Sequence, residues 1–286
     1  MKAREKYLGA IVVGALALAL LGGVGAWVAL APIAFAQAPG HKVPKTRALA
    51  PAPAAPPEVA MPFRIGEKLD YRIAWATFSD AATLELNVPE RRDLLGWQTW
   101  HLQAAFHTGR TVRTLFAIDD QFDSYTDTAS LESRQFEMYL NELGKKQTNI
   151  LRFVARGLPA RTPGPFVIVA PGTRDPLGTL FALRAVDWQH MPQVIAPVYD
   201  GHDLYEMHAH IEALSDSIQV DAGTFKASRI SITVFQNGKQ DPAIQFTIWF
   251  ANDAARTPVQ VVATLPFGNL KVELTAAKQG DAATSR

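Results

Sequence analysis

Residues 69–75 read Leu-Asp-Tyr-Arg-Ile-Ala-Trp, and large apolar side chains recur at every second position of this stretch. Successive side chains of a β-strand point to opposite faces of its sheet, so the stretch predicts a strand with two unlike faces. The apolar face carries Leu69, Tyr71, Ile73 and Trp75, and the polar face carries Lys68, Asp70 and Arg72. A strand of this kind is typical of an antiparallel sheet that is buried on one side.

The same alternation returns in residues 84–88, 100–106, 136–140, 230–234, 244–250 and 270–274. Glycines stand between such runs, where turns are expected, at Gly109, Gly144, Gly223, Gly238 and Gly268. The pattern predicts roughly ten to twelve strands. We therefore expect an all-β domain, mainly antiparallel, that forms a strongly curved sheet or an open β-barrel.

One segment departs from this pattern and predicts a short helix. Leu177, Leu180, Phe181 and Leu183 recur at helical spacing within Pro176–Val186. Asp175 is a suitable N-cap residue, and a proline directly after it is favoured at the first helical position. We expect this helix to pack against the curved sheet.

We expect the first segment of the chain to enter a membrane. Residues 8–31 carry no charged side chain and follow the basic residues Lys2, Arg4 and Lys6. A spanning helix needs about 20 apolar residues, so the length favours a retained signal-anchor. The sequence Ala34-Phe35-Ala36 is nevertheless typical of a cleavage site, which leaves removal of residues 1–36 as a signal peptide open. In both cases the basic end stays in the cytoplasm and the rest of the chain is exported.

Residues 37–61 contain six prolines and predict an extended linker. We therefore divide the chain into the signal segment 1–36, the linker 37–61, a β-domain at 62–276 and a disordered tail at 277–286. The expected location is the periplasm, with residues 8–31 tethering the domain to the inner membrane. The alternative is a soluble periplasmic protein released by cleavage after Ala36.

Composition limits the classes of function. Three of the 28 basic residues and one of the 27 acidic residues precede residue 37, so the remainder carries 25 basic and 26 acidic residues. This balance gives no basic surplus of the kind that binds nucleic acid. The chain has no cysteine, which excludes disulfides, thiolate metal sites and a cysteine nucleophile.

Several motifs resemble the DUF3108 family of exported bacterial proteins. The stretch Phe63–Tyr71 is similar to its F-x-x-G-E-x-L-x-Y opening, and Asp175-Pro176-Leu177 leading to Leu183-Arg184 is similar to its central helical stretch. Its later segments resemble Ala222–Phe225, Ile248–Asp253, Arg256 and Pro258-Val259. The resemblance covers residues 62–276 and implies a β-rich periplasmic domain. The family brings no established catalytic residues with it.

The densest group of metal-ligating side chains lies in residues 200–212. On a strand, His208 and His210 would share one face with Glu206 and Glu212. Two imidazoles and a carboxylate can bind Zn²⁺, although H-x-H alone does not locate a third ligand. A solvated polar sheet face explains the same residues. His101 and His107 are too far apart along one strand to form a site alone, and no catalytic motif is present.

The function we expect is non-catalytic binding of an apolar or amphipathic envelope component. The sheet would form an apolar wall and the Asp175–Val186 helix a lid, with Leu180, Phe181 and Trp188 near the cavity. Ordinary packing of the core also explains these side chains. The alternatives are an envelope scaffold that recruits a protein partner through exposed sheet edges, and a hydrolase or metalloprotein built around residues 200–212. We expect no cofactor and assign no catalytic residue.

Overall fold

The computed structural model describes residues 60–157, 165–265 and 268–280. The predicted signal-anchor at residues 8–31, the cleavage site after Ala36 and most of the predicted linker at residues 37–61 lie outside these ranges. Among the described residues, no helix is long and apolar enough to cross a membrane.

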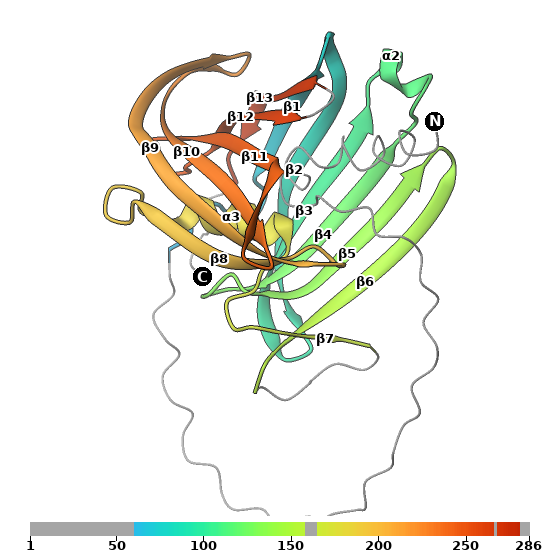
Figure 1. Cartoon of the computed structure of the whole chain (residues 1–286), viewed down its shortest axis with the longest axis vertical. Coiled ribbons are helices and arrows are strands. Elements are labelled where there is room, and N and C mark those ends of the chain that lie inside the picture. Colours follow the sequence, from blue (N-terminus) through green and yellow to red (C-terminus); the bar gives the residue numbers. More distant parts are fainter. Residues whose placement is uncertain (1–59, 158–164, 266–267, 281–286) are drawn as a thin grey trace, which may run out of the picture.

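Two antiparallel meanders form the protein (Figure 1). The first consists of β1 (Lys68–Trp75), β2 (Phe78–Leu94), β3 (Trp97–Thr108), β4 (Asp119–Asp127), β5 (Ser133–Glu142) and β6 (Lys145–Ala155), with the short helix α2 (Arg110–Arg113) between β3 and β4. The second consists of β8 (Gln193–Tyr199), β9 (Leu204–Val220), β10 (Gly223–Gln236), β11 (Lys239–Ala251), β12 (Pro258–Leu265) and β13 (Gly268–Lys278). Between the meanders lie a three-residue strand, β7 (Val167–Val169), and helix α3 (Pro176–Ala185).

Within the described residues, the two meanders and β7 make one sheet of 13 strands in the order β7-β6-β5-β4-β3-β2-β1-β13-β12-β11-β10-β9-β8. They join where β1 pairs with β13, from Lys68 opposite Lys278 to Trp75 opposite Leu270. Among the named strands of the described ranges, only β7 pairs in parallel, with β6. The first and last strands of the domain are therefore neighbours, and the two edges of the sheet are β7 and β8.

The sheet curves around α3 (Figure 1). This helix packs against β3 and β4 of the first meander and against β8 of the second. The inward side chains of both meanders belong to one hydrophobic core, which includes Leu69, Tyr71 and Ile73 of the first strand. The helix is buried along most of its length, so it fills the interior of the curved sheet instead of covering its outside.

The structure confirms an all-β, mainly antiparallel fold with few helices. It also confirms the predicted helix, which begins after an Asp175 N-cap and ends at Ala185. The sheet has more strands than predicted, and α2 was not expected. Strand β13 extends to Lys278, two residues into the segment predicted as a tail, and residues 281–286 lie outside the described part.

Gly109 lets the chain turn from β3 into α2 against the backbone of β2. Its amide donates to the Ala81 carbonyl at 2.7 Å, and a Cβ at this position would lie 2.3 Å from the Asp80 carbonyl oxygen. We expect Gly109→Ala to lower the free energy of unfolding by about 1–3 kcal/mol, since the backbone must move to admit the methyl group. Urea denaturation measures this change.

Gly238→Asn is the matched control for this substitution. Gly238 has open space around it and a φ of 75°, a conformation that asparagine tolerates. We expect a much smaller loss of stability in the control. Equal losses in the two variants would contradict the close-packing explanation.

Candidate functional site at helix α3

The start of α3 is fixed by a buried polar cluster on β4 and β5. The Asp175 carboxylate accepts hydrogen bonds from the Gly178 amide at 2.8 Å and from the hydroxyls of Ser124 and Ser133 at 2.5 Å each. The Asp175 amide in turn donates to Ser133 Oγ at 2.7 Å. Burial raises the pKa of Asp175, and these hydrogen bonds act in the opposite direction. The cluster therefore determines where the helix begins and which strands it contacts.

Gly178 lets the first turn of α3 approach these strands closely. A Cβ on residue 178 would lie 2.9 Å from Thr126 Cγ2 and 3.1 Å from Ser133 Oγ. Both contacts are shorter than those that side chains normally make. The helix and the strands are consequently in direct contact at this end.

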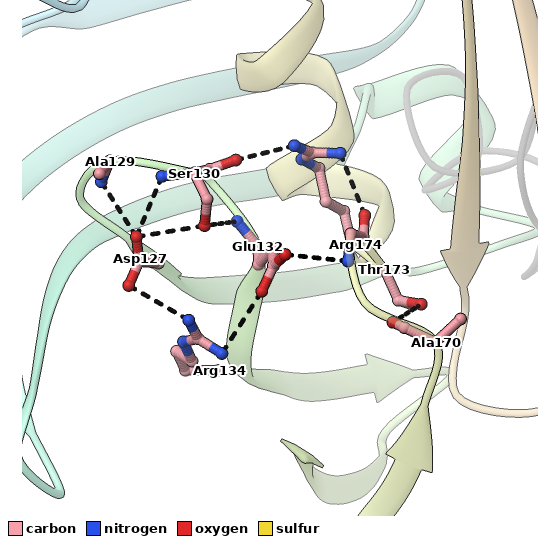
Figure 2. A network of polar contacts seen from close by, with 9 residues as sticks. Asp127, Ala129, Ser130, Glu132, Arg134, Ala170, Thr173 and Arg174 are labelled. Carbon is pink, nitrogen blue, oxygen red and sulfur yellow. Dashed lines mark hydrogen bonds and ion pairs between the residues drawn. The ribbon is translucent and has the colours of Figure 1, made fainter. Parts of the chain in front are cut away.

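The segment before α3 is held by a second polar network, drawn in Figure 2. Glu132, at the β4–β5 turn, accepts a hydrogen bond from the Gly172 amide at 2.9 Å and forms an ion pair with Arg134 at 3.6 Å. Arg134 also donates to Asp127 at 3.2 Å, and Asp127 accepts the amides of Ala129 and Ser130. These contacts therefore stabilise the β4–β5 turn where it meets residues 170–174.

Arg174 joins this network to the second meander. Its guanidinium donates to the Ser130 carbonyl at 2.7 Å and to the Gly172 carbonyl at 3.1 Å. Its backbone pairs with β8, because its amide donates to Pro197 at 3.2 Å and its carbonyl accepts the Tyr199 amide at 2.9 Å. This residue thus links the β4–β5 turn to the far edge of the sheet.

The end of α3 carries a buried ion pair. Arg184 donates to Glu67 through two hydrogen bonds, of 2.7 and 3.0 Å, and to the Ala255 carbonyl at 2.9 Å. The two side chains are 0% and 2% exposed. A bidentate arrangement of this kind is the geometry in which an arginine and a carboxylate interact most strongly. It connects the start of β1, the end of α3 and the β11–β12 loop.

Arg256 binds the last turn of α3 from the same loop. Its Nη1 donates to the carbonyls of Ala185 and Val186 at 2.9 Å each and reaches that of Arg184 at 3.3 Å. The Arg256 amide donates to the Asp253 carbonyl at 3.2 Å. The guanidinium satisfies helix carbonyls that would otherwise lack donors.

The predicted ligand-binding residues lie within the core. Leu180 and Trp188 are 4% and 6% exposed and Phe181 is fully buried. The Phe181 ring packs edge-on against Phe63 at 4.9 Å, and Phe63 packs against Trp100 at 5.1 Å. Chain segments from before β1, from β3 and from α3 thus meet in one aromatic cluster, which we call the Phe63 cluster (Phe63, Trp100 and Phe181).

The structure places the predicted metal candidates on the outside of β9. Glu206, His208, His210 and Glu212 share its outward face, and Tyr205, Met207 and Ala209 are buried on the other. His208 contacts Glu206 at 2.6 Å and the Phe235 ring at 4.4 Å. No three histidine, cysteine, aspartate or glutamate side chains within the described ranges are grouped closely enough to hold a metal ion.

His101 and His107 occupy the outer face of β3 and each contacts a carboxylate of β4. His101 lies 2.6 Å from Asp123 and stacks on Tyr125, while His107 lies 3.0 Å from Asp119. The structure does not bring the two histidines to one site.

The sheet edges carry features that discourage pairing with another chain. β7 is only three residues long, and β8 contains Pro197 and pairs in part with Arg174. An edge that is short or interrupted by proline offers few free amide donors to a partner strand.

Sequence reasoning missed the pairing of Glu67 with Arg184. Both residues belong to the family-like motifs, but Glu67 stands between Gly66 and Lys68, as a surface residue commonly does. The available signal was Arg184 itself, because it falls among the apolar positions of a helix that has little polar surface.

The family model described as a protein of unknown function, DUF3108, matches residues 70–275. No match was found among curated proteins. A β-barrel-like DUF1849 protein from Brucella abortus is 10% identical, with 77% of this chain and 99% of that chain covered and a TM-score of 0.46.

Two other solved structures are similar over comparable lengths. A Bacteroides fragilis protein described as a "putative exported protein" with a YmcC-like fold is 10% identical, with coverages of 77% and 98% and a TM-score of 0.35. A "putative lipoprotein" from Parabacteroides distasonis is 12% identical, with coverages of 76% and 97% and a TM-score of 0.36.

The buried pair leads to a prediction for a double-mutant cycle. Glu67→Gln or Arg184→Met alone should lower the free energy of unfolding by about 3–5 kcal/mol, since each leaves a charge buried without its partner. The double variant should lose clearly less than the sum of the two, because no unpaired charge remains. Denaturant unfolding of the four proteins measures the coupling.

Lys68→Met serves as the control, since Lys68 pairs with Glu85 at the surface of the same region. Exposed pairs contribute little, so we expect a small change there. Additive effects of the Glu67 and Arg184 substitutions would show that the two side chains do not act as a pair.

Proposed function

The chain belongs to the DUF3108 family, and we propose that its β-domain is an exported, non-catalytic binding domain for an apolar or amphipathic molecule of the cell envelope. In this proposal α3 is the lid, and the apolar inner face of the sheet is the wall against which the ligand lies. The observation that carries the proposal is the way α3 is held: a buried helix inside a curved sheet, fastened at its two ends by polar contacts.

The wall is supplied by both meanders. Inward side chains of β10, β11 and β13 are almost completely buried, among them Ile232, Ile248 and Val272. The first meander contributes inward residues of β2 and β3, such as Leu86 and Leu102. A molecule admitted between these strands would meet hydrocarbon on all sides, which suits an acyl chain or a similar apolar group.

The lid is supported by the chemistry of its ends. Asp175 is held by serine hydroxyls and Arg184 by Glu67, so each end depends on hydrogen bonds instead of apolar packing alone. A buried ion pair costs desolvation energy that largely offsets its attraction, and its main contribution is to select one arrangement. Such contacts favour a defined closed position that a ligand able to bind beneath α3 can displace.

While α3 is in its closed position, the side chains of the Phe63 cluster would occupy the ligand site. Phe63 and Phe181 fill the space between α3 and β3 and contact each other directly. Displacement of α3 would withdraw Phe181 and leave an apolar volume beside Phe63 and Trp100. Leu180 and Trp188, on or just after the same helix, would line its margin.

The proposed compartment rests on the sequence. The apolar segment 8–31 with its basic flank supports export, and the proline-rich residues 37–61 would hold the domain away from the bilayer. We propose accordingly that the domain lies in the periplasm, tethered to the inner membrane by residues 8–31. A tethered carrier of this type meets lipids and other amphipathic molecules at close range.

The proposal is tested by locking the lid. The chain contains no cysteine, so Thr126→Cys with Gly178→Cys creates the sole possible disulfide, at a place where a residue-178 Cβ would lie 2.9 Å from the Thr126 side chain. We expect the purified full-length chain to bind a long-chain fluorescent fatty acid. The oxidised double variant should bind it at least about tenfold more weakly, and a reductant should restore binding.

The single variant Gly178→Cys is the control for the tight packing at this position. It should bind the probe as the reduced double variant does. Failure of the wild-type chain to bind the probe, together with no lipid retained in native mass spectrometry, would overturn the binding function. Equal binding by oxidised and reduced double variants would overturn the role of α3 as the lid.

A further inference from the structure

Asp120 is a buried carboxyl group with an incomplete set of hydrogen bonds. It lies on the inward face of β4 and is 2% exposed. Its Oδ1 accepts the Asn141 amide at 2.7 Å, and its Oδ2 is buried without a donor among the described residues. An ionised carboxylate can accept several hydrogen bonds, so this environment favours the neutral acid.

The charged groups nearby do not compensate for burial. Asp119, on the same strand, holds Arg113 of α2 through bonds of 2.6 and 2.5 Å and also contacts His107 of β3 at 3.0 Å. Glu142 of β5 adds a further negative charge, and its own pKa is raised by burial. Arg113 and His107 thus pair with Asp119 on the outer face of β4, while Asp120 lies on the inner face with the acidic Glu142 nearby.

Burial raises the pKa of Asp120 to about 7. The Asn141 hydrogen bond opposes this shift, Glu142 and Asp119 reinforce it, and His107 opposes it weakly. The protonation of this carboxyl group therefore changes within the range of pH that an exported domain encounters.

Asp120 lies beneath a small rim of the sheet. We define the α2 rim as residues 109–118 and 141–144. Its two parts are joined by a hydrogen bond of 2.7 Å from the Leu143 amide to the Ala117 carbonyl and by a bridge between Ile118 and Glu142. Leu115 and Leu143 are 67% and 64% exposed at its surface. The Asn141 hydrogen bond thus connects Asp120 directly to a rim that carries exposed side chains.

We propose that the α2 rim is a pH-responsive element, closed while Asp120 is protonated and opened when Asp120 ionises. An ionised Asp120 needs a hydrogen bond from water or from a new donor. Separation of β5 from residues 117–119 would admit water to Asp120 by the shortest route. This inference concerns a different part of the sheet from α3 and does not depend on the proposed ligand.

The direction of the effect follows from proton linkage. In the open rim, Asp120 would have the pKa of an ordinary aspartic acid, about 4. The closed rim binds the Asp120 proton more tightly than the open rim does. The equilibrium constant for opening therefore rises by about tenfold per pH unit between about pH 4 and about pH 7, and then levels off. The closed rim is therefore most stable in acid.

Hydrogen exchange of the full-length chain measures this equilibrium. After correction for the intrinsic exchange rate, the amides of residues 115–118 and 141–144 should lose protection by at least about tenfold between pH 5 and pH 7, with little further change between pH 8 and pH 9. Asp120→Asn keeps the acceptor for Asn141 and cannot ionise, so its rim should remain protected at every pH.

Asp119→Asn is the matched control, since Asp119 neighbours Asp120 on the opposite face of β4. Removing this negative charge should move the transition to lower pH without abolishing it. A pH-independent rim in the wild-type chain, or an unchanged transition in Asp120→Asn, would overturn the proposal.

Discussion

The bidentate pair between Glu67 and Arg184 is the constraint on which the arrangement of the two meanders depends. Both charges are buried in an otherwise apolar interior, and neither can be satisfied unless the start of β1 and the end of α3 meet. The same guanidinium binds Ala255, and Arg256 of that loop binds the helix carbonyls. Three segments that are distant in sequence are thereby fixed at one point, and the aromatic rings of Phe63 and Phe181 pack beside it.

Much of the fold could be predicted because apolar and polar residues alternate along most of its strands. Leu69, Tyr71 and Ile73 alternate with polar residues and are buried, as the periodicity indicates. The helix was equally accessible, since Asp175 and Pro176 mark its first turn unambiguously. Local signals of this kind reflect forces that act within one strand or one turn. These signals can therefore be recognised in the sequence without knowledge of the rest of the fold.

The features that were missed arise from contacts between distant segments. β4 reads Asp-Asp-Gln-Phe-Asp-Ser-Tyr-Thr-Asp, and three of its inward positions are polar because Ser124 and Thr126 receive the first turn of α3 and Asp120 lies under the α2 rim. Periodicity cannot recognise such a strand. Of the candidate site, the sequence identified the helix and the residues Leu180, Phe181 and Trp188, whose role in binding stays a prediction. Arg184 and Glu67 stand 117 positions apart in the sequence, so their pairing became visible only in the folded chain.

The pairing of β1 with β13 has a consequence for how the domain is made. The sheet cannot become continuous until β13 is available to pair with β1. The two meanders therefore join only when both ends of the domain are present. Contacts between such remote residues slow folding, because loop closure has to precede any gain from them. A domain that is exported from its first strand to its last would accordingly reach its native topology only after the C-terminal segment had emerged.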